Sequence, residues 1–226
     1  MTKIVPFAPQ EMSLLRDLDE VIQAHVERVA QFQRDRETPV VSPEAVDLLL
    51  RTMISLLSEI IFEGRGRKWA LVGENCFDIG GCIDIEEAKT EARAKFLIFE
   101  SRFGLFLALD RAPFIGRARD SCWADITSLG NLGQLAFSPY AIPKSMWNRK
   151  GKVPIRPGHA VGELMRYWNL LREDGDSLVD FGELQVSWPL GTPLETLLPA
   201  MSETLETFYR IAYELYRLER QSSKRE

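Results

Sequence analysis

The hydrophobic residues of the N-terminal region recur at intervals of three and four, the spacing that places them on one face of a helix. This pattern predicts an amphipathic helix over residues 11–37, with one face formed by Leu15, Leu18, Ile22, His25, Val29 and Phe32. A second helix is expected to begin at Ser42-Pro43, because serine is a good N-cap and proline suits the first helical position.

The same spacing predicts three more helices. One runs from 85 to about 109, since Asp84 and Glu87 resemble a capping box and residues 86–95 are mostly strong helix formers. The others cover 160–172 and the segment from Thr192 to the C-terminus.

Only two short segments favour strands. They are Trp69 to Val72 and Glu183 to Trp188, and the second alternates polar and apolar residues. Residues 73–83 are expected to form a loop, and 111–162 loops, short helices and one hairpin.

The predicted fold class is therefore mainly α or α+β, with long amphipathic helices around one core and one or two short strands. The predicted organisation is an N-terminal helical arm (1–40), a core domain (41–190) and a C-terminal helix (191–226) that could serve as a dimerisation element.

Composition excludes several classes of protein. With 226 residues, 45% hydrophobic and 27% charged, the chain is neither disordered nor a basic nucleic-acid coat, and its net charge is −5. No apolar run approaches the roughly 18 residues of a membrane span. Three cysteines and the lack of a signal pattern predict a cytoplasmic location.

Charge is segregated along the chain. No acidic residue lies between Asp125 and Glu163, whereas the segment from Glu173 to Tyr209 contains eight acids and no Lys or Arg. The acid-free segment could neutralise phosphates, or it could be a solvated face or pack against the acidic stretch of the same chain or of a partner subunit. Its five cations are Lys144, Arg149, Lys150, Lys152 and Arg156.

Signatures of enzymes are sparse. The two histidines lie apart from any nucleophile motif, and the cysteine spacing does not suit zinc, so neither a catalytic site nor a cofactor is predicted. One pattern competes with this view: Asp78, Glu87 and Lys89 resemble the acidic-acidic-lysine signature of magnesium-dependent nucleases. That site requires a strand from 82 to 89, where a helix is predicted.

Two groups of motifs resemble a known family. The segment from Thr52 to Phe103 contains Ile60-Ile61-Phe62-Glu63-Gly64-Arg65, Ala70-Leu71-Val72-Gly73, Phe77 and the run from Ala94 to Glu100, and Leu135 to Ala141 follows later. These motifs resemble the AcaB-like transcriptional regulators of conjugative plasmids and integrative conjugative elements, over about residues 40–180.

This resemblance implies a dimeric DNA-binding regulator of transfer genes, related to the ribbon-helix-helix class, in which a two-stranded ribbon enters the major groove. Two segments are candidates for the ribbon. Glu183 to Trp188 presents Glu183, Gln185 and Ser187 on one face and precedes a helix, and Lys68 to Val72 follows two arginines.

Three functional hypotheses result. The first is a homodimeric regulator that binds double-stranded DNA and has no enzymatic activity. Its main phosphate contacts would come from the five cations of the acid-free segment, and the secondary candidates are Arg65, Arg67, Lys68, Arg117 and Arg119. The second is a protein-interaction or scaffold module that does not bind nucleic acid. The third is the magnesium-dependent nuclease.

Overall fold

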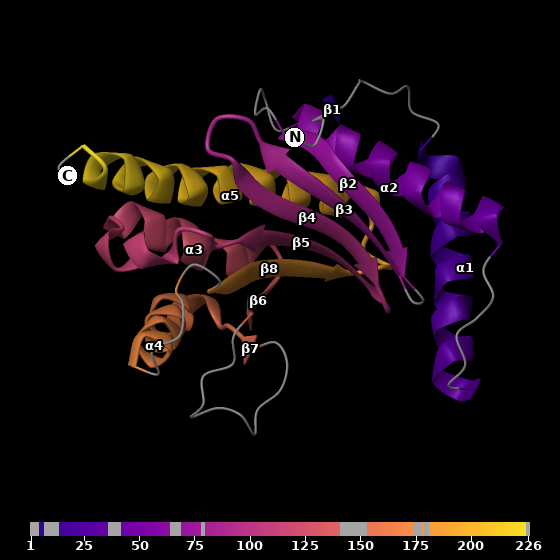
Figure 1. The fold of residues 1–226 in the computed structure, drawn as a ribbon. Coiled ribbons are helices and arrows are strands. Elements are labelled where there is room, and N and C mark those ends of the chain that lie inside the picture. Colours follow the sequence, from indigo (N-terminus) through magenta and orange to yellow (C-terminus); the bar gives the residue numbers. More distant parts are fainter. Residues whose placement is uncertain are drawn as a thin grey trace.

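The centre of the protein is one eight-stranded antiparallel sheet with the strand order β1-β2-β3-β4-β5-β8-β6-β7 (Figure 1). The computed structural model describes residues 5–6, 14–35, 42–63, 69–77, 80–140, 153–173, 178 and 181–224. The strands are β1 Val5–Pro6, β2 Trp69–Phe77, β3 Gly80–Glu87, β4 Ala92–Phe99, β5 Arg102–Ala108, β6 Gln134–Pro139, β7 Val153–Pro154 and β8 Gly182–Pro189.

Helices flank this sheet. The α-helices are α1 Leu14–Asp35, α2 Pro43–Glu63, α3 Asp120–Leu132, α4 Ala160–Glu173 and α5 Leu194–Ser222, and short 3-10 helices cover Ala112–Arg117 (η1) and Pro157–His159 (η3). None of the helices in the described ranges is both long and apolar enough to cross a membrane.

The predicted fold class is wrong, because the segment expected to be one long helix from 85 to 109 forms three strands. It contains the end of β3, all of β4 and all of β5. Along β4, Ala92, Ala94, Phe96 and Ile98 are buried while the residues between them are half-buried or exposed. A period of two is the burial pattern of a strand. Burial of these apolar side chains in the sheet therefore outweighed the helix propensity of the charged residues between them.

The turn between β3 and β4 explains the acids that suggested a helix cap. The Glu87 carboxylate is buried and accepts hydrogen bonds from the backbone N–H groups of Lys89 (3.1 Å) and Thr90 (2.8 Å) and from the Thr90 hydroxyl (2.8 Å). Glu91 then adopts a positive φ of 56°, a conformation that does not belong to a helix. Glu87 therefore closes a hairpin turn.

Two further expectations are corrected by the strand pairing. The predicted loop 73–83 is largely strand, since β2 runs to Phe77 and β3 begins at Gly80. The ribbon-helix-helix-like element is absent from the described residues: β8 pairs with β5 on one side and β6 on the other, and β2 lies between β1 and β3. β8 has no unpaired edge with which to bind a second copy, and β1 covers the second candidate at Ala70 and Leu71.

Other elements confirm the sequence-based predictions. Four expected helices are present as α1, α2, α4 and α5, and Ser42 accepts a hydrogen bond from the backbone N–H of Ala45 at the start of α2. The expected strand at 183–188 is β8, and the expected hairpin is formed by β6 and β7.

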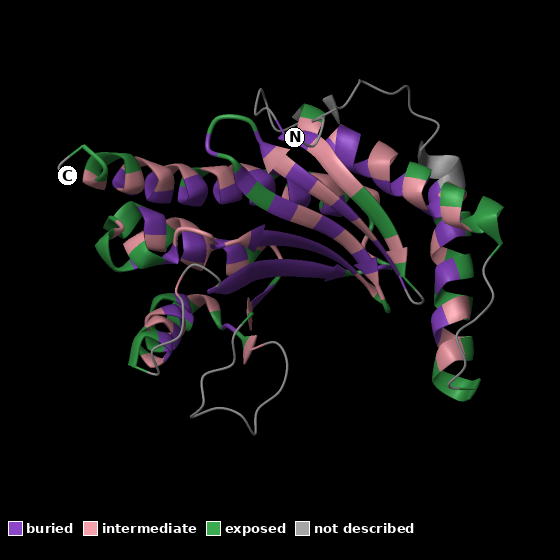
Figure 2. Ribbon diagram, viewed as in Figure 1, coloured by how far each residue is buried: buried purple, intermediate pink, exposed green. Residues whose placement is uncertain are grey.

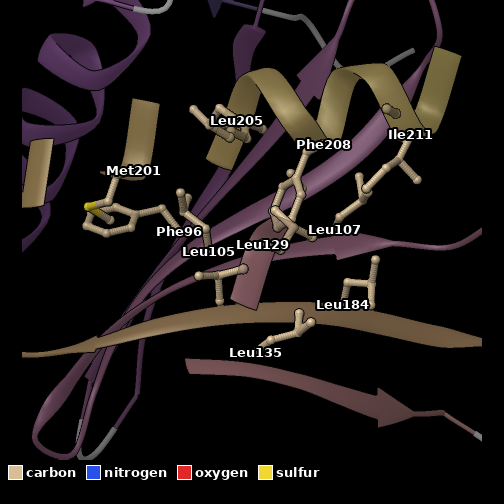
Figure 3. Close-up of a cluster of buried hydrophobic side chains, with 14 of the residues drawn as sticks. Phe96, Leu105, Leu107, Leu129, Leu135, Leu184, Met201, Leu205, Phe208 and Ile211 are labelled. Atoms are coloured by element: carbon tan, nitrogen blue, oxygen red, sulfur yellow. The ribbon is translucent and has the colours of Figure 1, made fainter. Parts of the chain in front are cut away.

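The hydrophobic core lies between one face of the sheet and the helices (Figures 1 and 2). In Figure 3, Leu205, Phe208 and Ile211 of α5 lie over Leu105 and Leu107 of β5. A Cβ added at Gly81 of β3 would meet Met53 and Leu49 of α2, so α2 packs on the same face. The apolar stripe of α5 is thus buried within its own chain, in one core with residues of the predicted arm and core domain.

The Glu87 turn yields a first prediction. Glu87→Ala leaves the buried Thr90 donors without an acceptor and should lower the free energy of unfolding by about 1–3 kcal/mol, measured by urea denaturation. Glu86→Ala is the matched control, because Glu86 is an adjacent half-buried acid on the opposite face of β3. Equal stability losses in the two variants would contradict the role assigned to Glu87.

Candidate binding pocket on the open sheet face

The alternation of strand side chains leaves one face of the sheet without the helices that cover the other. We call this the open face, defined by Cys82, Asp84 and Glu86 of β3, Arg93, Lys95, Leu97 and Phe99 of β4, Arg102, Phe106 and Ala108 of β5, and Glu183, Gln185 and Ser187 of β8. Phe106, Glu183, Gln185 and Ser187 are buried, so the accessible part of this face lies mainly over β3 and β4. The strand registers place these residues side by side: Lys95 pairs with Asp84 and Phe106, and Phe106 with Gln185. Strands β2 to β5 cross in front of α5 in Figure 1, so this face is turned toward the viewer.

A pocket of about 330 Å³ lies on the open face. This volume is at the lower end of the range typical of ligand sites. Its lining combines small apolar side chains with two acids, two cations and a phenol, namely Val72, Ala108, Asp84, Glu86, Arg93, Lys95 and Tyr140, together with Ile85 and Ala94.

A hydrogen-bonded group forms one side of this pocket. The Lys95 ammonium and the Tyr140 hydroxyl both donate to Oε1 of Glu183, each at 2.6 Å. Lys95 reaches Glu183 across β5 beside Ala108, whose small side chain is paired with Glu183 in the strand register. The charge of Lys95 is therefore compensated within the chain.

The protonation of this group follows from its contacts. Burial acts to lower the pKa of Lys95, but the hydrogen bond and charge of Glu183 outweigh it and raise the pKa above its ordinary value. Burial, followed by the hydrogen bond to Glu183, raises the pKa of Tyr140 well above its ordinary value. Lys95 thus stays charged, and Tyr140 stays a neutral donor.

The second cation of the pocket is also compensated. Arg93 forms a two-point ion pair with Asp110, through its Nε at 2.8 Å and through Nη2. Such bidentate pairs hold a guanidinium in a fixed orientation.

Asp84 and Glu86 differ from the other charged groups here. Neither forms an ion pair with any residue that the structure describes, and Asp84 accepts only a weak bond from the Cys82 thiol at 3.7 Å. The pocket lining itself carries two carboxylates and two cations, a formal net charge of zero, and the strand register places Lys95 opposite Asp84 and Arg93 opposite Glu86. The pocket is therefore a polar site of mixed charge.

Cys82 is not a nucleophile in this setting. Burial first, and then the charge of Asp84, raise the pKa of its thiol to about 12. Because the thiolate is the reactive form, the Cys82 thiol is inert near neutral pH. The described residues also contain no group of three or more His, Cys, Asp and Glu side chains that could hold a metal ion.

Most predicted DNA contacts lie outside the described residues. These are Lys144, Arg149, Lys150 and Lys152 of the acid-free segment, and Arg65, Arg67 and Lys68. Arg156 is described; it is exposed at the start of η3. The phosphate-binding role of these residues stays a prediction.

The other two predicted contacts, Arg117 and Arg119, are engaged within the chain. Arg119 forms a two-point ion pair with the buried Glu214 of α5, at 3.0 and 2.7 Å, and Arg117 donates to the Ser222 hydroxyl at 2.9 Å. Arg217 also donates to Glu214. The structure thus uses these arginines to attach α5 to η1 and α3.

The three residues of the nuclease pattern are not brought together in the described part of the chain. Asp78 lies outside it, and the Glu87 carboxylate is bonded to its own turn. The Lys89 ammonium lies 4.7 Å from the centroid of the Tyr213 ring, on α5. A strand does cover Glu87, so the helix-based argument against this site was wrong, although Lys89 lies beyond its end.

Sequence reasoning did not find the pocket. Its residues come from β2 to β5 and from Tyr140, most of which had been assigned to a helix or a loop. The signal that could have found them is the alternation of Arg93 and Lys95 with Ala92, Ala94 and Phe96, which is a strand pattern.

Comparisons with known proteins found no matching family model, curated protein or solved structure. The resemblance to AcaB-like regulators therefore stays a prediction.

The ion pairs of Glu214 lead to a pH-dependent prediction. Burial acts to raise the pKa of Glu214, but the hydrogen bonds and charges of Arg217 and Arg119 outweigh it and lower the pKa to about 2. A carboxylate with a lowered pKa stabilises the fold above its ordinary value of 4.5, and this contribution is lost as the pH falls toward 2. Glu214→Gln should thus lower the free energy of unfolding by about 1–3 kcal/mol at pH 7.

Urea denaturation between pH 7 and pH 2.5 measures this effect, and the difference from wild type should shrink as the pH falls. Glu203→Gln on the same helix is the control, since Glu203 forms a more exposed pair with Arg210 and such pairs contribute little. A difference for Glu214→Gln that is constant across the pH range would contradict the prediction.

Proposed function

We propose that this chain is a protein-interaction module without catalytic activity, and that the open face of its sheet is the binding surface. The observation that carries this proposal is the charged pocket on a sheet face that no described helix covers. In that pocket Lys95 and Arg93 form ion pairs with Glu183 and Asp110, while Asp84 and Glu86 form none with any described residue.

The composition of the open face supports a protein partner. Leu97 is half-buried on this face and is not part of the hydrophobic core, and Tyr140 is 46% exposed at the pocket. Apolar and aromatic side chains surrounded by charged groups are typical of protein interfaces, where a few such residues supply most of the binding energy. The open face provides both kinds of group on a rigid scaffold.

The ion pairs favour a protein partner over DNA at this surface. Phosphate binding depends on neutralising cations, whereas Lys95 and Arg93 are already paired with Glu183 and Asp110. Arg117 and Arg119 are already bonded to Ser222 and Glu214. DNA binding, the rival hypothesis, rests on Arg156 and on cations outside the described residues, and homodimer formation stays a separate prediction.

The proposal is tested with a charge substitution on the open face. Tagged wild-type protein is purified from the source cells, and a co-purifying protein is identified, produced separately and titrated by calorimetry. Leu97→Arg should weaken this binding at least about tenfold, or about 1.4 kcal/mol, because it places a cation beside the pocket. Val161→Arg is the matched control on α4, where the side chain is 38% exposed.

Gel shifts with duplex DNA at two salt concentrations, with and without magnesium, test the rival hypotheses in parallel. We expect no shift and no cleavage. A salt-sensitive shift that survives Leu97→Arg, but is lost when Arg149, Lys150 and Lys152 become alanine, would overturn the proposal in favour of the DNA-binding regulator. Light scattering of the same samples shows whether the captured protein is a second copy of the chain.

A further inference from the structure

One side of α5 carries a row of tyrosines that the open face does not include. Tyr209, Tyr213 and Tyr216 follow one another at spacings of four and three residues, so they lie on the same side of the helix. All three are half-buried, and Tyr213 and Tyr216 are not part of the hydrophobic core. The same spacing adds Glu206 before the tyrosines and Arg220 after them. We call these five residues the tyrosine stripe.

The aromatic rings of the tyrosine stripe are held in place by their neighbours. The rings of Tyr209 and Tyr213 stack with centroids 5.8 Å apart, and those of Tyr213 and Tyr216 are 6.5 Å apart. The Arg220 guanidinium lies 5.8 Å from the centroid of the Tyr216 ring. Tyrosine and arginine are enriched among the residues that dominate binding energy at protein interfaces, and side chains that are already ordered lose little entropy on binding.

The charges of the tyrosine stripe are complementary to those of a reversed copy. Glu206 lies seven residues before Tyr213, and Arg220 lies seven residues after it. A two-fold axis beside Tyr213 and perpendicular to the helix therefore brings Glu206 of each copy near Arg220 of the other. An interface between two identical copies must be complementary to itself in this way. We propose that two copies of the chain associate through the tyrosine stripe, with their α5 helices antiparallel.

The other charges around the stripe do not oppose this pairing. Ion pairs within the chain hold the neighbouring charged residues of α5, namely Arg210 with Asp125, Arg217 with Glu214, and Glu219 with Arg111. Lys89 lies over the Tyr213 ring, and Glu91 of the same exposed turn balances its charge. Lys224 is exposed one turn beyond Arg220 and adds to the positive end of the stripe.

This inference is independent of the proposed function, because α5 lies behind the strands in Figure 1 while the open face is turned toward the viewer. A second copy also suits the stripe better than a polyanion does. A polyanion would meet Glu206 on this surface as well as the cations, whereas an antiparallel copy gives each charge an opposite partner.

Sedimentation velocity and light scattering of the full chain over a range of concentrations measure the association. We expect the mass to rise from that of one chain toward that of two. Glu206→Arg or Arg220→Glu brings like charges together at two symmetry-related positions and should weaken association at least about tenfold. The double variant exchanges the two charges and should restore association to within about threefold of wild type.

The charge exchange also tests the orientation of the helices. In a parallel pair each stripe residue would face its own copy, so neither single substitution would change attraction into repulsion. Glu173→Arg at the exposed end of α4 is the matched control, because it makes the same change of charge away from α5 and should leave association unchanged. Circular dichroism and urea denaturation of each variant show whether it is folded.

Three results would overturn the inference. They are a wild-type chain that stays monomeric at every concentration, single variants that associate as wild type does, and a double variant that associates as weakly as the single ones. None of these results bears on the proposed function, since Leu97 and the rest of the open face are unchanged in all the variants.

Discussion

The packing of α5 against one side of the sheet is the constraint that determines which residues can have a function here. Leu205, Phe208 and Ile211 are buried against β5 and its neighbours, and this places one set of alternating strand residues in the core. The other set, including Asp84 and Lys95, must face the opposite way, because strand side chains alternate. The chemistry of the open face is therefore a direct consequence of how α5 packs.

Ion pairs within the chain then decide what the surface offers to a partner. Arg119 is bonded to Glu214, Lys95 to Glu183, and Arg93 to Asp110. Segments with opposite charge in the sequence thus neutralise each other in space. Counting cations along the sequence therefore overestimates how many of them a polyanion could contact. Such a count also does not show that Asp84 and Glu86 of β3 form no ion pair with a described residue.

The helices could be predicted from the sequence much better than the sheet. The predictions for α1, α2, α4, α5 and β8 were right because each has a clear period of 3.6 or 2 residues. Residues 85–95 were wrongly predicted to be helical because Glu86, Glu87 and Lys89 have a high helix propensity. Their actual conformation depends on pairing between β3 and β4 and on the buried Glu87 turn, and the strand alternation of residues 92–96 was given less weight than this propensity. The pocket was missed for the same reason, since its residues meet only when these strands pair.

The edges of the sheet limit where an added strand can bind. An exposed edge strand can accept an added strand, which is a common mode of peptide recognition. The outermost strands β1 and β7 have two residues each, of which one is proline, and proline has no N–H to donate. β1 covers only Ala70 and Leu71 of β2, however, so among the described residues the outer edge of β2 from Val72 to Phe77 has no strand partner. Strand addition is therefore disfavoured at β1 and β7 but not along the rest of β2, whereas a partner on the open face must be recognised by its side chains, since the backbone groups there are used in strand pairing.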